Sequence, residues 1–169
     1  MKQIKIKGKR NIEAIKNIKD KKRDISKDWN KNLLESKNHQ NYINMLYLDE
    51  QFDGNNILKK ELTKKINGYK NQDKKRNILN TEKLIKFDEL VEKILISKLN
   101  CYYCKRKCLL LYENVREEKQ WTLDRLDNDI GHYNDNVVIC CLKCNLKKRR
   151  MDDGDFKFIK QMKIIKKDI

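Results

Sequence analysis

The sequence lacks any apolar run long enough to cross a membrane, and its first ten residues have no apolar core of the kind found in a secretory signal. These absences predict a soluble intracellular protein without membrane contact, located in the cytoplasm, nucleus or nucleoid. Proline is also absent and no internal repeat is present. From a length of 169 residues we expect one domain, or one domain with an arm.

Acidic residues are scarce relative to basic ones. The 169 residues contain 25 Asp and Glu against 41 Lys and Arg, which gives a net charge of +16 and a pI near 9.5. Such an excess predicts a polyanionic partner, and nucleic acid is the commonest one. An AT-rich coding sequence would also enrich lysine, asparagine and isoleucine together, but drift alone does not explain so large an imbalance.

Three segments are expected from the distribution of charge and cysteine. Residues 1–28 form a basic flexible arm, 29–85 a lysine-rich helical extension, and 86–169 a zinc-containing domain. Within the extension, we expect one helix from Trp29 to Leu48 and a second that Asn67-Gly68 stops. The basic segment from Tyr69 to Asn77 that follows is either a loop that contacts phosphates or a solvated charged face.

The third segment combines helices with short strands. Its first helix is predicted by apolar residues at helical spacing between Phe87 and Leu99. A strand is expected at Trp121–Leu123, a β-branched run precedes the second cysteine pair, and a C-terminal helix is expected from Phe156 to Ile169. The fold class is therefore α+β.

Six cysteines include two pairs with Cys-x-x-Cys spacing. In a reducing compartment this spacing favours a metal over disulfides, and no thioredoxin-like pattern supports redox chemistry. Four thiolates can hold one tetrahedral structural zinc, so the candidate ligands are Cys101, Cys104, Cys141 and Cys144. Cys108 and Cys140 are alternatives to these ligands.

Two hard oxygen ligands lie near the second pair. Asp124 follows the strand at Trp121–Leu123, and Asn145 comes directly after Cys144. A carboxylate and an amide oxygen can share Mg²⁺ or Mn²⁺ with water and a phosphate. A calcium loop is excluded, because glycine and the terminal glutamate do not fall where an EF-hand needs them.

Together these residues resemble the zinc-containing HNH nucleases, also called ββα-metal or His-Me finger nucleases. The similarity covers about residues 99–151 and is carried by Leu123-Asp124-Arg125, Gly131-His132, Asn136-Val137-Val138 and Cys141-x-x-Cys144-Asn145-x-x-Lys148. The resemblance implies a small ββα-metal unit with structural zinc knuckles. It also implies that Asp124 and Asn145 hold the catalytic metal and that Asn136 braces the site.

Arg125 departs from this family, in which many members have histidine as general base after the metal-binding aspartate. An arginine does not lose its proton at neutral pH. His132 would then supply the base, or a metal-bound water would attack while Arg125 stabilises the phosphate, or the site would be inactive. For His132 a purely structural role, with hydrogen bonds to the backbone, is the alternative. The Asp-Arg variant itself occurs within this group of nucleases.

A basic cluster lies on or after the helix that carries the second cysteine pair, and we expect it to contact the nucleic-acid backbone: Lys143, Lys147, Lys148, Arg149 and Arg150. The leading hypothesis is a metal-dependent HNH-type DNA endonuclease, with RNA as the alternative substrate and a homodimer left open. The second is a catalytically inactive, zinc-stabilised nucleic-acid-binding protein. The third is a zinc-scaffolded protein-interaction module.

Overall fold

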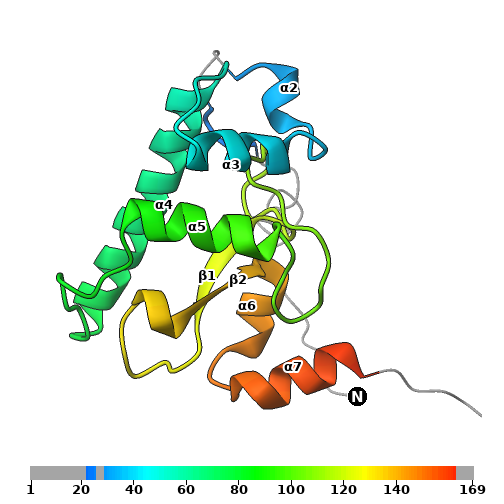
Figure 1. The fold of residues 1–169 in the computed structure, drawn as a ribbon. Helices are drawn as coiled ribbons and strands as arrows, with labels where there is room; N and C mark the ends of the chain where they lie inside the picture. The colour runs from blue at the N-terminus through cyan, green and yellow to red at the C-terminus, as the bar shows by residue number, and fades with distance from the viewer. Residues whose placement is uncertain (1–21, 26–28, 163–169) are drawn as a thin grey trace, which may run out of the picture.

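The computed structural model describes residues 22–25 and 29–162, so most of the predicted arm and the end of the predicted C-terminal helix lie outside the described residues. The fold is α+β, with a small two-stranded antiparallel sheet and several helices (Figure 1). In chain order the elements are α2 (Lys31–Leu34), α3 (His39–Tyr47), α4 (Asn55–Lys75), α5 (Phe87–Ser97), β1 (Trp121–Arg125), the 3-10 turn η1 (Asn134–Asn136), β2 (Val137–Cys141), α6 (Leu142–Lys148) and α7 (Asp153–Gln161).

Helix α5 lies at the centre and contacts α3, α4 and β2 (Figure 1). Leu90, Val91 and Ile94 are almost fully buried along one face, as the apolar spacing predicted. The first turn is closed by the Glu89 carboxylate, which accepts a hydrogen bond of 2.7 Å from the Lys86 backbone N–H. The chain then leaves the helix through a left-handed residue, Lys98, and enters the first cysteine turn.

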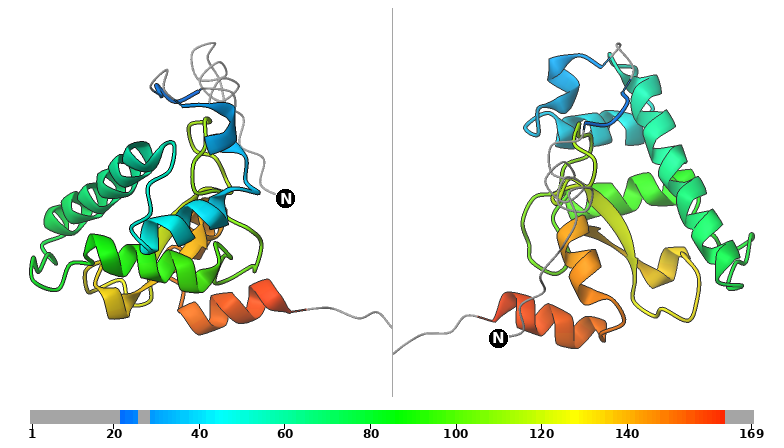
Figure 2. Two further views of the ribbon diagram at one scale, coloured as in Figure 1. Left: turned by 45° about the horizontal axis from the view of Figure 1, so that its top comes forward. Right: turned by 180° about the vertical axis from the view of Figure 1, so that it is seen from behind.

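Helix α4 runs through the glycine that was expected to stop it, so the predicted loop at Tyr69–Asn77 is wrong. Gly68 has open space around it, and its cost in a helix is only about 1 kcal/mol. Leu62, Tyr69 and Asp73 follow one another at helical spacing and are all buried. Burial of this face outweighs the glycine, and the end of the helix lies beside the loop after β1 (Figure 2). There Asp73 accepts a hydrogen bond from the His132 backbone N–H.

The sheet is a pair of strands in a register that runs from Trp121 opposite Cys141 to Arg125 opposite Val137. All five residues of β1 are buried, so the strand is covered on both faces. Helix α6 begins directly after β2 and contacts both strands. The two strands and α6 therefore form one continuous strand–strand–helix unit.

Two polar side chains connect the N-terminal segments with other parts of the chain. The expected helix from Trp29 to Leu48 is interrupted, giving the short α2 and then α3. The buried His39, at the start of α3, donates from Nε2 to the carbonyl of Leu33 and accepts at Nδ1 from the Leu110 N–H, each at 3.1 Å. Arg23 forms an ion pair with Glu61 at 2.5 Å.

Candidate functional site

Four cysteine thiols meet where the first cysteine turn touches the end of β2. Their Sγ atoms all lie within 4.8 Å of one another, and they belong to Cys101, Cys104, Cys141 and Cys144. A backbone hydrogen bond of 2.9 Å from the Tyr102 N–H to the Ile139 carbonyl holds the turn against β2. Zinc–thiolate bonds of about 2.3 Å separate the sulfurs of a tetrahedral site by about 3.8 Å. The 3.9 Å between the sulfurs of Cys104 and Cys141 matches this value, so the cluster is compatible with a structural zinc.

The other two cysteines lie outside the cluster. Cys108 is buried, and Cys140 contacts the hydroxyl of Thr122 at 3.3 Å. Burial raises the pKa of both thiols, that of Cys108 to about 12, and keeps them neutral. Within the cluster, the hydrogen bond between Cys101 and Cys141 lowers the pKa of Cys101 and raises that of Cys141, and burial raises the pKa of Cys144 to about 12. The protein alone therefore favours a thiolate at Cys101 and not at Cys141 or Cys144.

Asp124 is 5% exposed and is anchored through one carboxylate oxygen. Its Oδ2 accepts a hydrogen bond of 2.5 Å from the Tyr103 hydroxyl and lies 3.3 Å from Nζ of Lys148. Burial raises the pKa of Asp124, while the contacts with Tyr103 and Lys148 oppose that rise. Tyr103 belongs to the first cysteine turn, so the cluster also positions this carboxylate. Oδ1 of Asp124 has no protein hydrogen-bond partner among the described residues.

Asn145 extends from α6 to the strand that carries Asp124. Its Nδ2 donates to the hydroxyl of Thr122 and to the carbonyl of Leu123, each at 3.1 Å. These two bonds fix which atom of the amide faces the strand, because only the nitrogen can donate. The amide oxygen of Asn145 accepts no hydrogen bond from the described part of the chain. Asp124 and Asn145 thus each keep one oxygen for a ligand.

His132 is buried against α4 and is held by Asp73. The carboxylate accepts from the His132 backbone N–H and contacts ring Nδ1, both at 2.7 Å, and the imidazole stacks on Tyr69 with ring centroids 4.6 Å apart. An ionised carboxylate only accepts, so the ring proton lies on Nδ1. Burial lowers the pKa of His132, although Asp73 opposes the shift. No hydrogen bond or ion pair joins His132 to Asp124 in the described ranges.

Arg125 and Asn136 hold the loop that follows β1. Arg125 donates to the Ile130 carbonyl at 3.2 Å and lies 3.9 Å from the Asp73 carboxylate. Asn136 donates from Nδ2 to the carbonyls of Asp127 and Gly131, and its Oδ1 accepts from the Asp127 N–H. The loop is therefore braced from inside by Asn136 and from α4 by Asp73.

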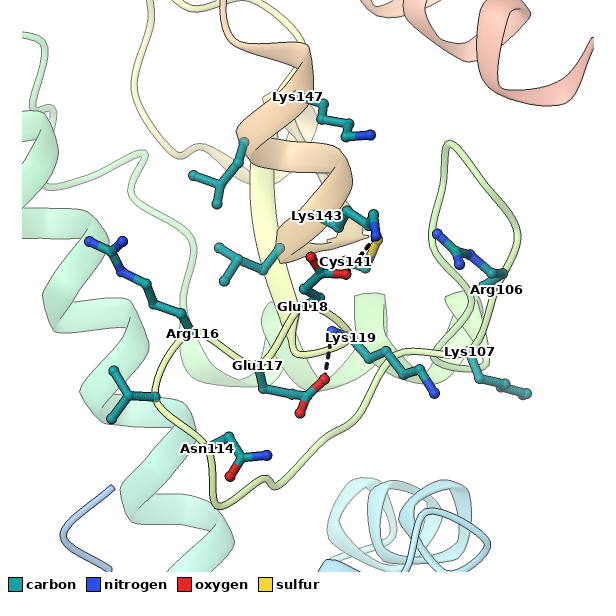
Figure 3. Close-up of a pocket in the computed structure, with 13 residues that line it drawn as sticks. Arg106, Lys107, Asn114, Arg116, Glu117, Glu118, Lys119, Cys141, Lys143 and Lys147 are labelled. Carbon is teal, nitrogen blue, oxygen red and sulfur yellow. Dashed lines mark hydrogen bonds and ion pairs between the residues drawn. The ribbon is translucent and has the colours of Figure 1, made fainter. Parts of the chain in front are cut away.

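The five basic residues of the predicted cluster lie in three different places. Lys148 is 1% exposed and also donates to the Arg125 carbonyl at 2.8 Å. Arg149 and Arg150 line a pocket of about 520 Å³ together with Arg76, from the end of α4. Lys143 and Lys147 line a larger pocket on another face of α6 (Figure 3). Contact with a nucleic-acid backbone stays a prediction for all five.

Sequence reasoning did not identify Asp73 and Tyr103, the partners of His132 and Asp124. Asp73 lies 59 residues before His132, in a segment predicted as a loop. Its spacing from Leu62 and Tyr69 places a carboxylate on an apolar helical face, which is an unusual position for a charged group. That position was the signal in the sequence that could have identified Asp73. For Tyr103 no comparable signal exists, because a tyrosine inside a cysteine turn is ordinary.

Comparisons of the chain with known protein families, with curated proteins and with solved structures found no match. Among the described residues, no helix is both long and apolar enough to span a membrane.

Proposed function

We propose that the chain is a metal-dependent DNA endonuclease of the HNH, or ββα-metal, type, with β1, β2 and α6 as its catalytic unit. The proposal rests on one observation: Asp124 and Asn145 are each anchored through one side-chain atom and keep Oδ1 without a protein partner among the described residues. Asn145 is bonded to the carbonyl directly before Asp124, so the two side chains lie beside the same stretch of β1. Carboxylate and amide oxygens suit Mg²⁺ or Mn²⁺.

A divalent ion held by Asp124 and Asn145 would polarise the scissile phosphate and neutralise its developing charge. The candidate base is His132, because its pKa is lowered and a neutral imidazole can accept a proton. The Asp73 carboxylate holds the ring proton on Nδ1, which leaves Nε2 as the accepting atom. Arg125 remains a cation and would stabilise negative charge on the phosphate instead.

The substrate backbone would be held by guanidinium groups near this unit. Arg76, Arg149 and Arg150 converge on one pocket although they come from two helices far apart in the sequence. Guanidinium groups bind phosphate oxygens in a bidentate manner, which favours a phosphodiester chain as the ligand. In this proposal residues 86–169 are the nuclease domain, 29–85 the helical extension and 1–28 the basic arm.

A second function is a zinc-stabilised nucleic-acid-binding protein without catalysis. It is favoured by Lys148, whose buried ammonium already neutralises part of the Asp124 charge, and by arginine at position 125. In this case the same guanidinium pocket would bind nucleic acid, and no bond would be cleaved.

Nicking of supercoiled plasmid by the zinc-loaded protein separates the two functions. With Mg²⁺ or Mn²⁺ we expect nicked circles, and we expect Asp124→Asn to slow nicking by at least about 100-fold, since a metal ligand contributes several kcal/mol to transition-state stabilisation. The substitution keeps the shape of the side chain. Zinc content and DNA affinity should be unchanged.

Asp135→Asn is the matched control, because this carboxylate lies in the same loop region between β1 and β2 but is exposed and does not line the pocket of Arg76, Arg149 and Arg150. It should nick at the rate of the natural chain. Equal nicking by the Asp124 variant would refute the proposed metal site. DNA binding without any nicking, for plasmid and for branched or single-stranded substrates, would leave the non-catalytic function.

A further inference from the structure

A pocket of about 790 Å³ opens on the side of the molecule formed by the first cysteine turn, the 114–119 loop and helix α6 (Figure 3). α6 contributes Leu142, Lys143, Leu146 and Lys147 to its wall, while Asn145 and Lys148 project to β1 and Asp124. One face of α6 therefore lines this pocket and another face contacts β1 and Asp124. A ligand in the pocket would not need to touch Asp124.

The rim of this pocket is strongly basic. Six lining residues carry a positive charge, namely Arg106, Lys107, Arg116, Lys119, Lys143 and Lys147, against the two acids Glu117 and Glu118. One acid is already engaged, because Glu118 forms an ion pair with Lys143 at 2.6 Å. The pocket thus selects a negatively charged ligand.

The apolar part of the pocket lining, called the floor below, is mainly aliphatic. Val115, Leu142 and Leu146 form this apolar part of the lining together with Cys141, and Leu146 is 63% exposed. No aromatic ring is among the described residues that line it. A nucleobase would find no stacking partner there, and a phosphate backbone would leave the apolar floor uncovered.

The overall charge of the chain does not favour the chain as its own occupant. Its first 21 residues contain far more lysine and arginine than aspartate and glutamate, and a second copy brings a net charge of +16. Both have the same sign of charge as the rim. A ligand that pairs with the basic rim and also covers the apolar floor must carry carboxylates on both sides of an apolar side chain.

We propose that this pocket is a docking site for an acidic segment of a partner protein, anchored by aliphatic side chains on the floor formed by Leu142 and Leu146. Carboxylates on both sides of the anchor would pair with the basic rim. This inference is independent of nuclease activity, because it involves neither Asp124 nor the residues that contact it.

Fluorescence anisotropy with a labelled peptide tests this site. The probe has two central leucines flanked on each side by three glutamates, and its comparison peptide has serines in place of the leucines. We expect the leucine peptide to bind at physiological ionic strength at least tenfold more tightly than the serine peptide. Leu146→Glu should weaken its binding at least tenfold, because it removes apolar surface and adds a like charge.

Leu48→Glu is the matched control, since Leu48 is also 63% exposed but lies at the end of α3. It should bind the peptide as the natural chain does, and bound zinc and circular dichroism would show that both variants are folded. Equal binding of the two peptides, or no binding, would overturn the proposal. Single-stranded DNA would be the better occupant if it displaced the peptide and if its own affinity were also weakened by Leu146→Glu. That result would reassign the pocket to nucleic acid.

Discussion

Lys148 is a buried cation whose position depends on two acceptors. It lies 3.3 Å from Oδ2 of Asp124 and donates to the carbonyl of Arg125, with 1% of its surface exposed. Charged groups leave water at a high free-energy cost, which only a close partner of opposite charge offsets. The ammonium therefore stabilises the ionised form of Asp124 in the absence of any other cation.

Lys148→Met is expected to lower the free energy of unfolding by about 3 kcal/mol, because it leaves the Asp124 carboxylate buried beside an apolar chain. Urea denaturation at neutral pH measures this loss. The double variant with Asp124→Asn should recover much of it, since no unpaired charge then remains. If the double variant is no more stable than Lys148→Met, the two side chains are not coupled and the ion pair does not stabilise the fold.

Among the elements, the first cysteine turn and helix α6 depend most on each other. They meet at the thiol cluster, and the hydrogen bond from Tyr102 to Ile139 holds the turn against β2, the strand that leads directly into α6. Helix α6 has only seven residues, which is too short to be stable without tertiary contacts. The position of Asn145 on this helix thus depends on the cluster.

Cys104→Ser is expected to abolish stoichiometric zinc binding and to destabilise the strand–strand–helix unit, because a three-thiolate site binds zinc less tightly than a four-thiolate site. Zinc released on denaturation, measured with a chromophoric chelator, gives the stoichiometry. Cys108→Ser is the control, and it should keep its zinc because this thiol lies outside the cluster. If Cys108→Ser lost its zinc and Cys104→Ser kept it, Cys108 and not Cys104 would be the zinc ligand.

Features that follow from a regular local spacing of residues were predictable from the sequence. The two cysteine pairs, helix α5 and strand β1 belong to this group, because each follows from a local pattern. The extent of α4 was not predictable, since Gly68 and the lysines after it have the local character of a loop. Asp73 was missed for the same reason. The helix continues to Asp73 only because that part of it is buried against the loop between β1 and β2, and this burial is not visible in the local sequence. The environment of Lys148 was also missed, since a lysine in a basic run gives no sign that it is buried.

At the scale of the whole molecule, positive charge converges from segments that are distant in the sequence. Arg76 ends α4, whereas Arg149 and Arg150 follow α6, and the three line one pocket. A net charge of +16 would by itself attract nucleic acid. Because these three arginines line one pocket, we predict that each contributes more to nucleic-acid affinity than an average basic residue of the chain.

Replacement of Arg76, Arg149 and Arg150 by glutamine is expected to reduce the dependence of DNA affinity on salt. The slope of log K against log salt concentration should fall by about 0.9 for each phosphate that the variant no longer neutralises. Anisotropy titrations of a labelled duplex at several salt concentrations measure the slope. Replacement of Lys37, Lys60 and Lys64, three exposed lysines elsewhere, is the control with the same change in charge. Equal slopes for the two triple variants would mean that only net charge matters.

The thiol cluster also sets an order of events during protein synthesis. Cys104 and Cys141 are 37 residues apart, and the segment between them includes Asp124, His132 and Asn136. At about 5 to 20 residues per second, a ribosome needs roughly 2 to 7 seconds to make that segment. A nascent chain therefore presents its first cysteine pair alone for seconds, and a complete four-thiolate site is first available after Asp124, His132 and Asn136 have been made, one residue before Asn145.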